Sequence, residues 1–132
     1  MPDYPLSLLS SIVDELVAAP KFNFNTDLRR NLVSAAGIYR ISSISDDPAS
    51  EIYTGKSGNL RQRIYGNHLR GTVDNSTLTR KLVNLGIYAD SNAVHTFLAE
   101  KCVVQFLVIP DDRLRCFAEH YAIAVLQPAY ND

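Results

Sequence analysis

The chain has 132 residues, a length typical of one domain with a single hydrophobic core. Hydrophobic residues make up 46% and charged residues 20%, a composition that excludes a disordered chain. No apolar run approaches the ~20 residues that span a bilayer. The first four residues lack the basic region and cleavage site of a secretory leader. We therefore expect a cytoplasmic protein without membrane contact.

The charges are unevenly distributed, although the net charge is only −1. Residues 28–85 carry a net charge of +5, so the rest of the chain carries −6. A basic middle in a near-neutral protein is compatible with a surface that faces phosphate groups, and equally with a solvated face that has no partner. The basic residues in this stretch are Arg29, Arg30, Arg40, Lys56, Arg61, Arg63, Arg70, Arg80 and Lys81.

The cysteines and histidines do not form a metal-binding pattern. Cys102 and Cys116 lack metal-ligand spacing, so we expect buried free thiols. The histidines, His68, His95 and His120, are also too scattered to predict a zinc site.

The first 36 residues predict a helical extension that packs on the following domain. Residues 6–19 place apolar side chains at helical spacing and end before Pro20. A dimer contact is the alternative role of this helix. Asn25 or Thr26 is suited to cap a short second helix over residues 27–32.

A hairpin is predicted next. Residues 36–41 and 51–55 are two β-prone runs, and residues 42–50 between them are rich in Ser, Asp and Pro. Each run holds a tyrosine, Tyr39 or Tyr53, and a glycine, Gly37 or Gly55, that permits close approach to the backbone. Packing is the usual role of strand tyrosines.

A helix is expected to follow this hairpin over residues 59–70, with Leu60, Ile64 and His68 on one face and Arg63 on its flank. Its N-terminal amides would then lie beside the tyrosines, where they favour a phosphate. Further helices are predicted over residues 76–85, with Ser76 as the N-cap, and over residues 91–101.

The last third of the chain predicts a central strand and a buried helix. Residues 102–109 are nearly all apolar and end at Pro110. Residues 113–126 form the helix, with Asp111 or Asp112 as the cap. Glu119 lies in its middle, and a buried carboxylate needs an ion pair or a metal. Arg115, one turn earlier, is the structural candidate for that pair.

Five motif elements stand in order along the chain: Gly37-Ile38-Tyr39, Tyr53-Thr54-Gly55-Lys56, Asn59-Leu60-Arg61-Gln62-Arg63, Glu119, and Asn131 within Gln127-Pro128-Ala129-Tyr130-Asn131. Together they resemble the GIY-YIG nuclease superfamily over about three-quarters of the chain. One departure is that the second motif has Thr54 where the family pattern has isoleucine.

The resemblance implies an α+β fold with a small three-stranded antiparallel sheet flanked by helices, in a stand-alone catalytic domain over residues 37–132. It also implies hydrolysis of DNA phosphodiester bonds with one divalent cation, Mg²⁺ or Mn²⁺. Glu119 would hold the cation. Arg63 would bind the non-bridging oxygens in the transition state. Tyr39 would be the general base, with Tyr53 orienting the water or the first phenol, and Asn131 would pin the site.

The resemblance also implies a role for other residues. His68 would contact the phosphate or assist proton transfer, unless it is a packed helix-end residue. Lys56 would bind phosphate or tune a tyrosine pKa, whereas His95 and His120 match nothing. The expected DNA-backbone contacts are Lys56, Arg61, Arg70, Arg80 and Lys81.

Two alternatives to a general DNA endonuclease stay open. One is a nucleic-acid-binding or scaffold module that has the fold without turnover. The other is a structure-selective nuclease on branched DNA. Specificity is expected from a homodimer, from a partner protein, or from surface loops such as residues 71–75. One site cuts one strand, so a double-strand break would need two copies or two visits. The biological setting, restriction or repair among others, is not indicated by the sequence.

Overall fold

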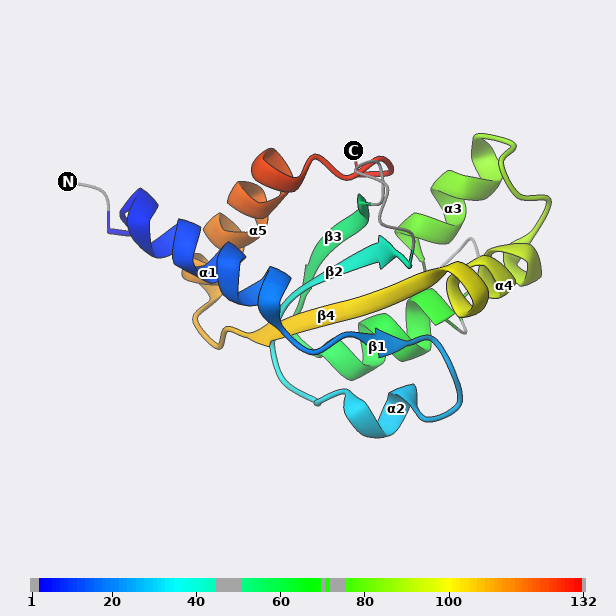
Figure 1. Ribbon diagram of the computed structural model, residues 1–132, viewed down its shortest axis with the longest axis horizontal. Helices are drawn as coiled ribbons and strands as arrows, with labels where there is room; N and C mark the ends of the chain where they lie inside the picture. The colour runs from blue at the N-terminus through cyan, green and yellow to red at the C-terminus, as the bar shows by residue number, and fades with distance from the viewer. Residues whose placement is uncertain (1–2, 45–50, 70, 72–75, 132) are drawn as a thin grey trace.

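A computed structural model of the protein describes residues 3–44, 51–69, 71 and 76–131, and within them an α+β fold. It contains a four-stranded antiparallel sheet and six helices (Figure 1). The strands are β1 (Phe22–Asn23), β2 (Gly37–Ser43), β3 (Glu51–Ser57) and β4 (Cys102–Val108). The helices are α1 (Leu6–Ala18), α2 (Leu28–Asn31), η2 (Gln62–Leu69), α3 (Thr77–Asn84), α4 (Ser91–Lys101) and α5 (Asp112–Leu126).

The sheet contains one more strand than predicted. Its order is β1-β4-β2-β3, so the predicted hairpin, β2 with β3, lies at one side and β4 is internal as expected. The three-strand prediction is wrong because β1 also joins the sheet, with Phe22 opposite Val104 and Asn23 opposite Val103. A strand of two residues is too short to produce an alternating pattern in the sequence.

The two faces of the sheet are covered by different helices. Ile38 points to a cluster with residues of α1 and α5, which lie beside each other in Figure 1. Its neighbour Tyr39 points to the larger cluster on the opposite face, together with residues of α2, η2, α3 and α4. This alternation follows from the period of two along a strand. Tyr39 therefore lies on the face opposite α5.

A buried polar network ties the sheet to the end of α1. Arg40 on β2 forms an ion pair with Glu51 on β3, and its Nη1 donates to Gln105 Oε1 on β4 at 2.6 Å. Gln105 Nε2 in turn donates to the carbonyls of Val17 and Ala19 at 2.7 and 2.8 Å. Each buried charge or amide thus has a partner, which is the condition for burying such groups.

Helix ends follow the predicted caps in two cases. Ser76 Oγ accepts from Thr79 N at 3.1 Å, and Asp111 Oδ1 accepts from Leu114 N at 2.9 Å. At α2, neither Asn25 nor Thr26 is the N-cap, since that position is held by Asp27 without a side-chain cap hydrogen bond.

The helix after the hairpin differs from the prediction in two ways. Residues 62–69 form a π-helix rather than an α-helix. The backbone amides of Leu60 and Arg61 donate to the carbonyls of Ala35 and Val33 at 2.9 and 3.0 Å. Because these amides are already bonded, they do not form the predicted phosphate site at the helix N-terminus.

The first 36 residues contribute to the sheet and to the core as well as to the surface. Strand β1 and the buried residues Phe24, Leu28 and Leu32 come from this stretch. The boundary at residues 36 and 37 stays a prediction. In the part of the chain that the structure describes, no helix is long and apolar enough to cross a membrane.

Gly37→Ala should destabilise the fold, because the added Cβ would lie 2.0 Å from the Leu107 carbonyl oxygen and 2.8 Å from Leu60 Cδ1. We expect a loss of about 1–3 kcal/mol in the free energy of unfolding, measured by urea titration. Gly58→Ala is the matched control, since nothing lies within 4 Å of its Cβ position. Equal stability of the two variants would contradict the close approach at Gly37.

Candidate active site

The candidate site is built around the outer edge of β3, the last strand of the sheet. The side chain of Asn131 bridges Thr54 twice, accepting from its N–H at 2.9 Å and donating to its carbonyl at 2.7 Å. The Glu119 carboxylate accepts from the backbone N–H of Lys56. An unpaired strand edge needs such partners. The edge therefore fixes two of the predicted site residues.

Glu119 borders a hollow of about 320 Å³, which we name the Glu119 hollow. It is lined by Tyr53, Thr54, Glu119, His120, Ile123 and Asn131. Burial raises the pKa of Glu119 above its ordinary value, and the positive charges of Lys56, His120 and Arg63 act against that rise. The suggested ion pair between Glu119 and Arg115 is not formed, because Arg115 pairs with Asp112 and with the carbonyls of Ile109 and Pro110.

The two motif tyrosines lie at different depths. Tyr53 is half-buried and lines the Glu119 hollow, whereas Tyr39 is only 1% exposed. Their ring centroids are 6.2 Å apart. Tyr39 packs against the backbone of Gly55, where a Cβ would lie 2.5 Å from its hydroxyl oxygen. The glycine of the second motif thus makes room for the tyrosine of the first.

The hydroxyl of Tyr39 is enclosed and bonded to His68. Its oxygen lies 2.6 Å from His68 Nε2, and His68 Nδ1 lies 3.0 Å from Ser76 Oγ. The first distance is short for an N–H donor and normal for an O–H donor, whereas the second suits N–H···O. We therefore assign Tyr39 as the donor to Nε2 and Nδ1–H as the donor to Ser76.

The Tyr39–His68 pair is neutral in this arrangement. Burial raises the pKa of Tyr39 well above 10, with Tyr53 and Glu119 adding to the rise and Arg63 opposing it. Burial, helped by the charge of Arg63, lowers the pKa of His68 to about 3. His68 is fully buried, so it has no direct access to a phosphate. Tyr39 lacks the exposure and the low pKa that a general base needs.

The π-helix explains how His68 comes to lie beneath the site. In an α-helix, residues five apart are about 140° from each other around the axis. The wider turn of a π-helix brings positions i and i+5 onto a common side. Arg63 and His68 are five apart in η2, and the charge of Arg63 acts on both His68 and Glu119.

Arg63 borders a second hollow on the same strand. This Arg63 hollow, of about 310 Å³, is lined by Ser57, Gly58, Asn59, Gln62, Arg63 and Asn67. The half-buried Arg63 side chain makes no hydrogen bond or ion pair with the rest of the described chain. Its guanidinium is therefore available for a ligand, and its planar fork suits a phosphate.

The predicted DNA contacts fall into three groups: exposed side chains, side chains bonded to backbone carbonyls, and one residue outside the described part of the chain. Lys56 and Arg80 are exposed. Arg61 is bound to the Leu32 carbonyl at 2.8 and 3.2 Å, so its guanidinium has a structural role at the end of α2. Arg70 lies outside the described residues. Lys81 Nζ donates to the Asn131 carbonyl at 3.2 Å, which joins α3 to the C-terminal segment.

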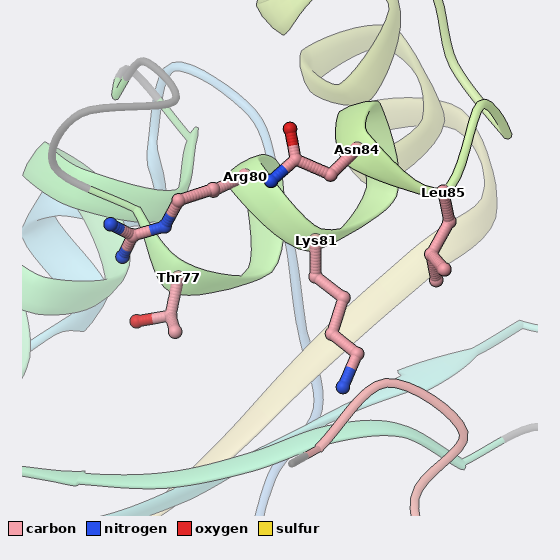
Figure 2. Close-up of a pocket in the computed structure, with 5 residues that line it drawn as sticks. All are labelled: Thr77, Arg80, Lys81, Asn84 and Leu85. Atoms are coloured by element: carbon pink, nitrogen blue, oxygen red, sulfur yellow. The ribbon is translucent and has the colours of Figure 1, made fainter.

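A third hollow lies on α3. This α3 hollow, of about 280 Å³, is lined by Thr77, Arg80, Lys81, Asn84 and Leu85. Figure 2 shows Lys81 extending toward the C-terminal segment, while Arg80 extends toward the start of the helix. Residues 77, 80, 81 and 84 follow the i, i+3, i+4, i+7 spacing of one helix face. That face presents hydrogen-bond donors and two cations.

Sequence reasoning missed three residues at the site. His120 is exposed, lines the Glu119 hollow, and has Nε2 3.8 Å from Glu119 Oε1. Ser76 was assigned only as a helix cap, but it also contacts His68. Thr54, which the sequence presents only as a departure from the motif, also lines the Glu119 hollow. The only available signal was proximity in sequence, to Glu119 for His120 and to Tyr53 for Thr54.

Other titratable groups do not add a metal centre. Cys102 is buried, as predicted, and burial raises its pKa to about 12, whereas Cys116 is only partly buried. His95 Nε2 contacts the Gly71 carbonyl at 2.6 Å. Among the described residues, no group of three or more His, Cys, Asp or Glu side chains is placed to hold a metal.

No protein-family model, curated protein or solved structure matches this chain. The resemblance to the GIY-YIG superfamily therefore rests on the motif residues themselves.

His68 should make the protein acid-labile. The unfolded chain binds a proton at this residue below about pH 6.5, but the folded protein does so only near pH 3. Stability present above pH 6.5 is therefore lost as the pH falls, by about 1.4 kcal/mol per pH unit at most. Urea unfolding between pH 6 and pH 4 should show a steeper loss for the wild type than for His68→Gln.

The control for this experiment is His120→Gln, which removes an exposed histidine and should keep most of the wild-type pH dependence. A His68→Gln variant whose stability falls with pH as steeply as that of the wild type would show that His68 is protonated in the folded state.

Proposed function

We propose that the protein is a metal-dependent endonuclease of the GIY-YIG type that hydrolyses DNA phosphodiester bonds. The observation that carries this proposal is that Tyr53 and Glu119 line one hollow at the edge of β3, with the ring of Tyr39 6.2 Å from that of Tyr53 and with Arg63 bordering a second hollow at the end of the same strand. These residues are distant in sequence, and the charge of Arg63 acts on both Tyr39 and Glu119. A phosphate placed between the Glu119 and Arg63 hollows would meet a carboxylate, a phenol and a guanidinium that has no partner among the described residues.

The donor set fits a single hydrated cation such as Mg²⁺ or Mn²⁺. Mg²⁺ keeps several of its waters and needs only one or two carboxylates together with substrate phosphates. Glu119 supplies the carboxylate, and the raised pKa caused by its burial marks a site where a cation would be favourable. Thr54 lines the same hollow, and its buried Oγ1 has no hydrogen-bond partner among the described groups. When bound, the cation would supply charge stabilisation for the phosphate and the leaving oxygen.

The chain's own residues then divide the remaining work. Arg63 binds the non-bridging oxygens, where its permanent charge opposes the charge that develops in the transition state. Tyr53 contacts the attacking water, because it is the tyrosine that lines the Glu119 hollow. Tyr39 lies beside Tyr53, and its hydroxyl is hydrogen-bonded to His68. Asn131 holds the edge of β3 in place.

DNA is the proposed partner, bound through its phosphate backbone. Lys56 is exposed beside Glu119, and the α3 hollow adds the exposed Arg80. A homodimer or a partner protein would supply specificity, and two copies would be needed to cut both strands, since one site cuts one strand.

A nucleic-acid-binding module without turnover is the second candidate. The enclosed hydroxyl of Tyr39 and its raised pKa favour this reading, because they describe a phenol that is not ready to act as a base.

Glu119→Gln separates these two functions. The amide oxygen of glutamine can still accept from Lys56 N–H, so the strand edge stays paired while the charge is lost. We expect Mg²⁺-dependent nicking of supercoiled DNA to fall about 100-fold or more, with little change in thermal stability. Glu100→Gln, on exposed α4 surface, is the matched control.

Absence of metal-dependent cleavage by the wild type on linear, supercoiled, flapped and junction DNA would reject the enzyme and leave the binding module. Wild-type activity in Glu119→Gln would reject the proposed cation site.

Arg80→Ala tests the proposed contact of α3 with the DNA backbone. Loss of one phosphate contact should weaken binding on any sequence and reduce the slope of log K against log salt by about 1. Arg29→Ala on α2 changes the net charge equally and should leave that slope unchanged. Fluorescence anisotropy over a salt series measures both variants. The same slope in the two variants would place α3 outside the DNA-binding surface.

A further inference from the structure

Thr54 carries the feature that the proposed roles leave unexplained. Its residue is 0% exposed, and its Oγ1 has no hydrogen-bond partner among the described groups. A buried hydroxyl without a partner is costly, and most buried polar side chains have one. The same strand position could hold an apolar β-branched side chain without that cost, and isoleucine stands there in the family pattern that the chain resembles.

The location of Thr54 points to a ligand. Its backbone N–H and carbonyl are both bonded to Asn131, so only the hydroxyl is left over. Thr54 lines the Glu119 hollow, and it lies two residues before Lys56, whose N–H binds the Glu119 carboxylate. Side chains two apart on a strand point to the same face. Thr54 therefore shares with Lys56 the sheet face that α5 covers, which is the face from which Glu119 comes.

We propose that the Thr54 hydroxyl is part of the cation site, where it hydrogen-bonds to a water of the hydrated cation that Glu119 holds. This inference rests on the proposed function, since it needs a cation at Glu119. A hydrated Mg²⁺ or Mn²⁺ presents water protons around it, and a hydroxyl oxygen can accept one of them. Binding then gives the unpartnered oxygen its hydrogen bond.

The proposal predicts opposite effects on stability and on cation binding. Thr54→Val has nearly the same shape, and it removes the unpartnered hydroxyl. The melting temperature Tm of the metal-free protein should therefore rise. Affinity for Mn²⁺, followed by the electron paramagnetic resonance signal of the free ion, should fall about 3- to 10-fold, the range for one hydrogen bond. A purely structural threonine would not give this combination.

Thr79→Val is the matched control, because Thr79 Oγ1 is the other buried hydroxyl without a partner among the described residues, and it lies on α3. Its Tm should rise as well, with Mn²⁺ affinity unchanged. Thr54→Ser retains the hydroxyl and should bind Mn²⁺ like the wild type, which keeps the test valid if Thr54→Val folds poorly.

Unchanged Mn²⁺ affinity in Thr54→Val, or weakened affinity in Thr54→Ser, would overturn the role of the hydroxyl. Equal Mn²⁺ binding by the wild type and Glu119→Gln would overturn the proposed cation site instead, so the two failures are distinguishable.

Discussion

The open edge of β3 is the constraint on which the site depends. Strand β3 ends the sheet, so its outward N–H and carbonyl groups need partners from outside the sheet. The C-terminal segment supplies them through the N–H groups of Ala129 and Tyr130 and through the Asn131 side chain, and α5 supplies the Glu119 carboxylate. Satisfying this backbone edge brings residues from the end of the chain to a hairpin some 70 positions earlier.

The neutral and the charged groups of the site lie at different depths, because Tyr39 and His68 are buried and the charged side chains are not. Burial raises the pKa of Tyr39 and lowers that of His68 to about 3, so transfer of the proton from the phenol to the imidazole is unfavourable and the buried pair stays neutral. The charged groups lie outside this buried pair: Lys56 is exposed, Glu119 borders a hollow at the edge of β3, and Arg63 borders a second hollow.

Much of the fold was predictable, because hydrophobic periodicity and caps are local. The hairpin of β2 and β3, the internal position of β4, and the caps of α3 and α5 followed from the sequence. The burial of Tyr39 and the binding of Arg61 and Lys81 to backbone carbonyls were not predictable. They depend on how separate elements pack, and a motif specifies residue types and spacing without depth or hydrogen-bond partners.

The hydrogen bonds at the edge fix the residues around the proposed cation site. Both polar atoms of the Asn131 side chain bond to the backbone of Thr54, which holds that side chain in place at the strand edge. An ionised carboxylate can accept hydrogen bonds in about four lone-pair directions, and Glu119 uses one of them to accept from Lys56 N–H. The rest face a site that burial makes unfavourable for an uncompensated negative charge. A cation would relieve that penalty, and the same carboxylate would keep the strand edge paired.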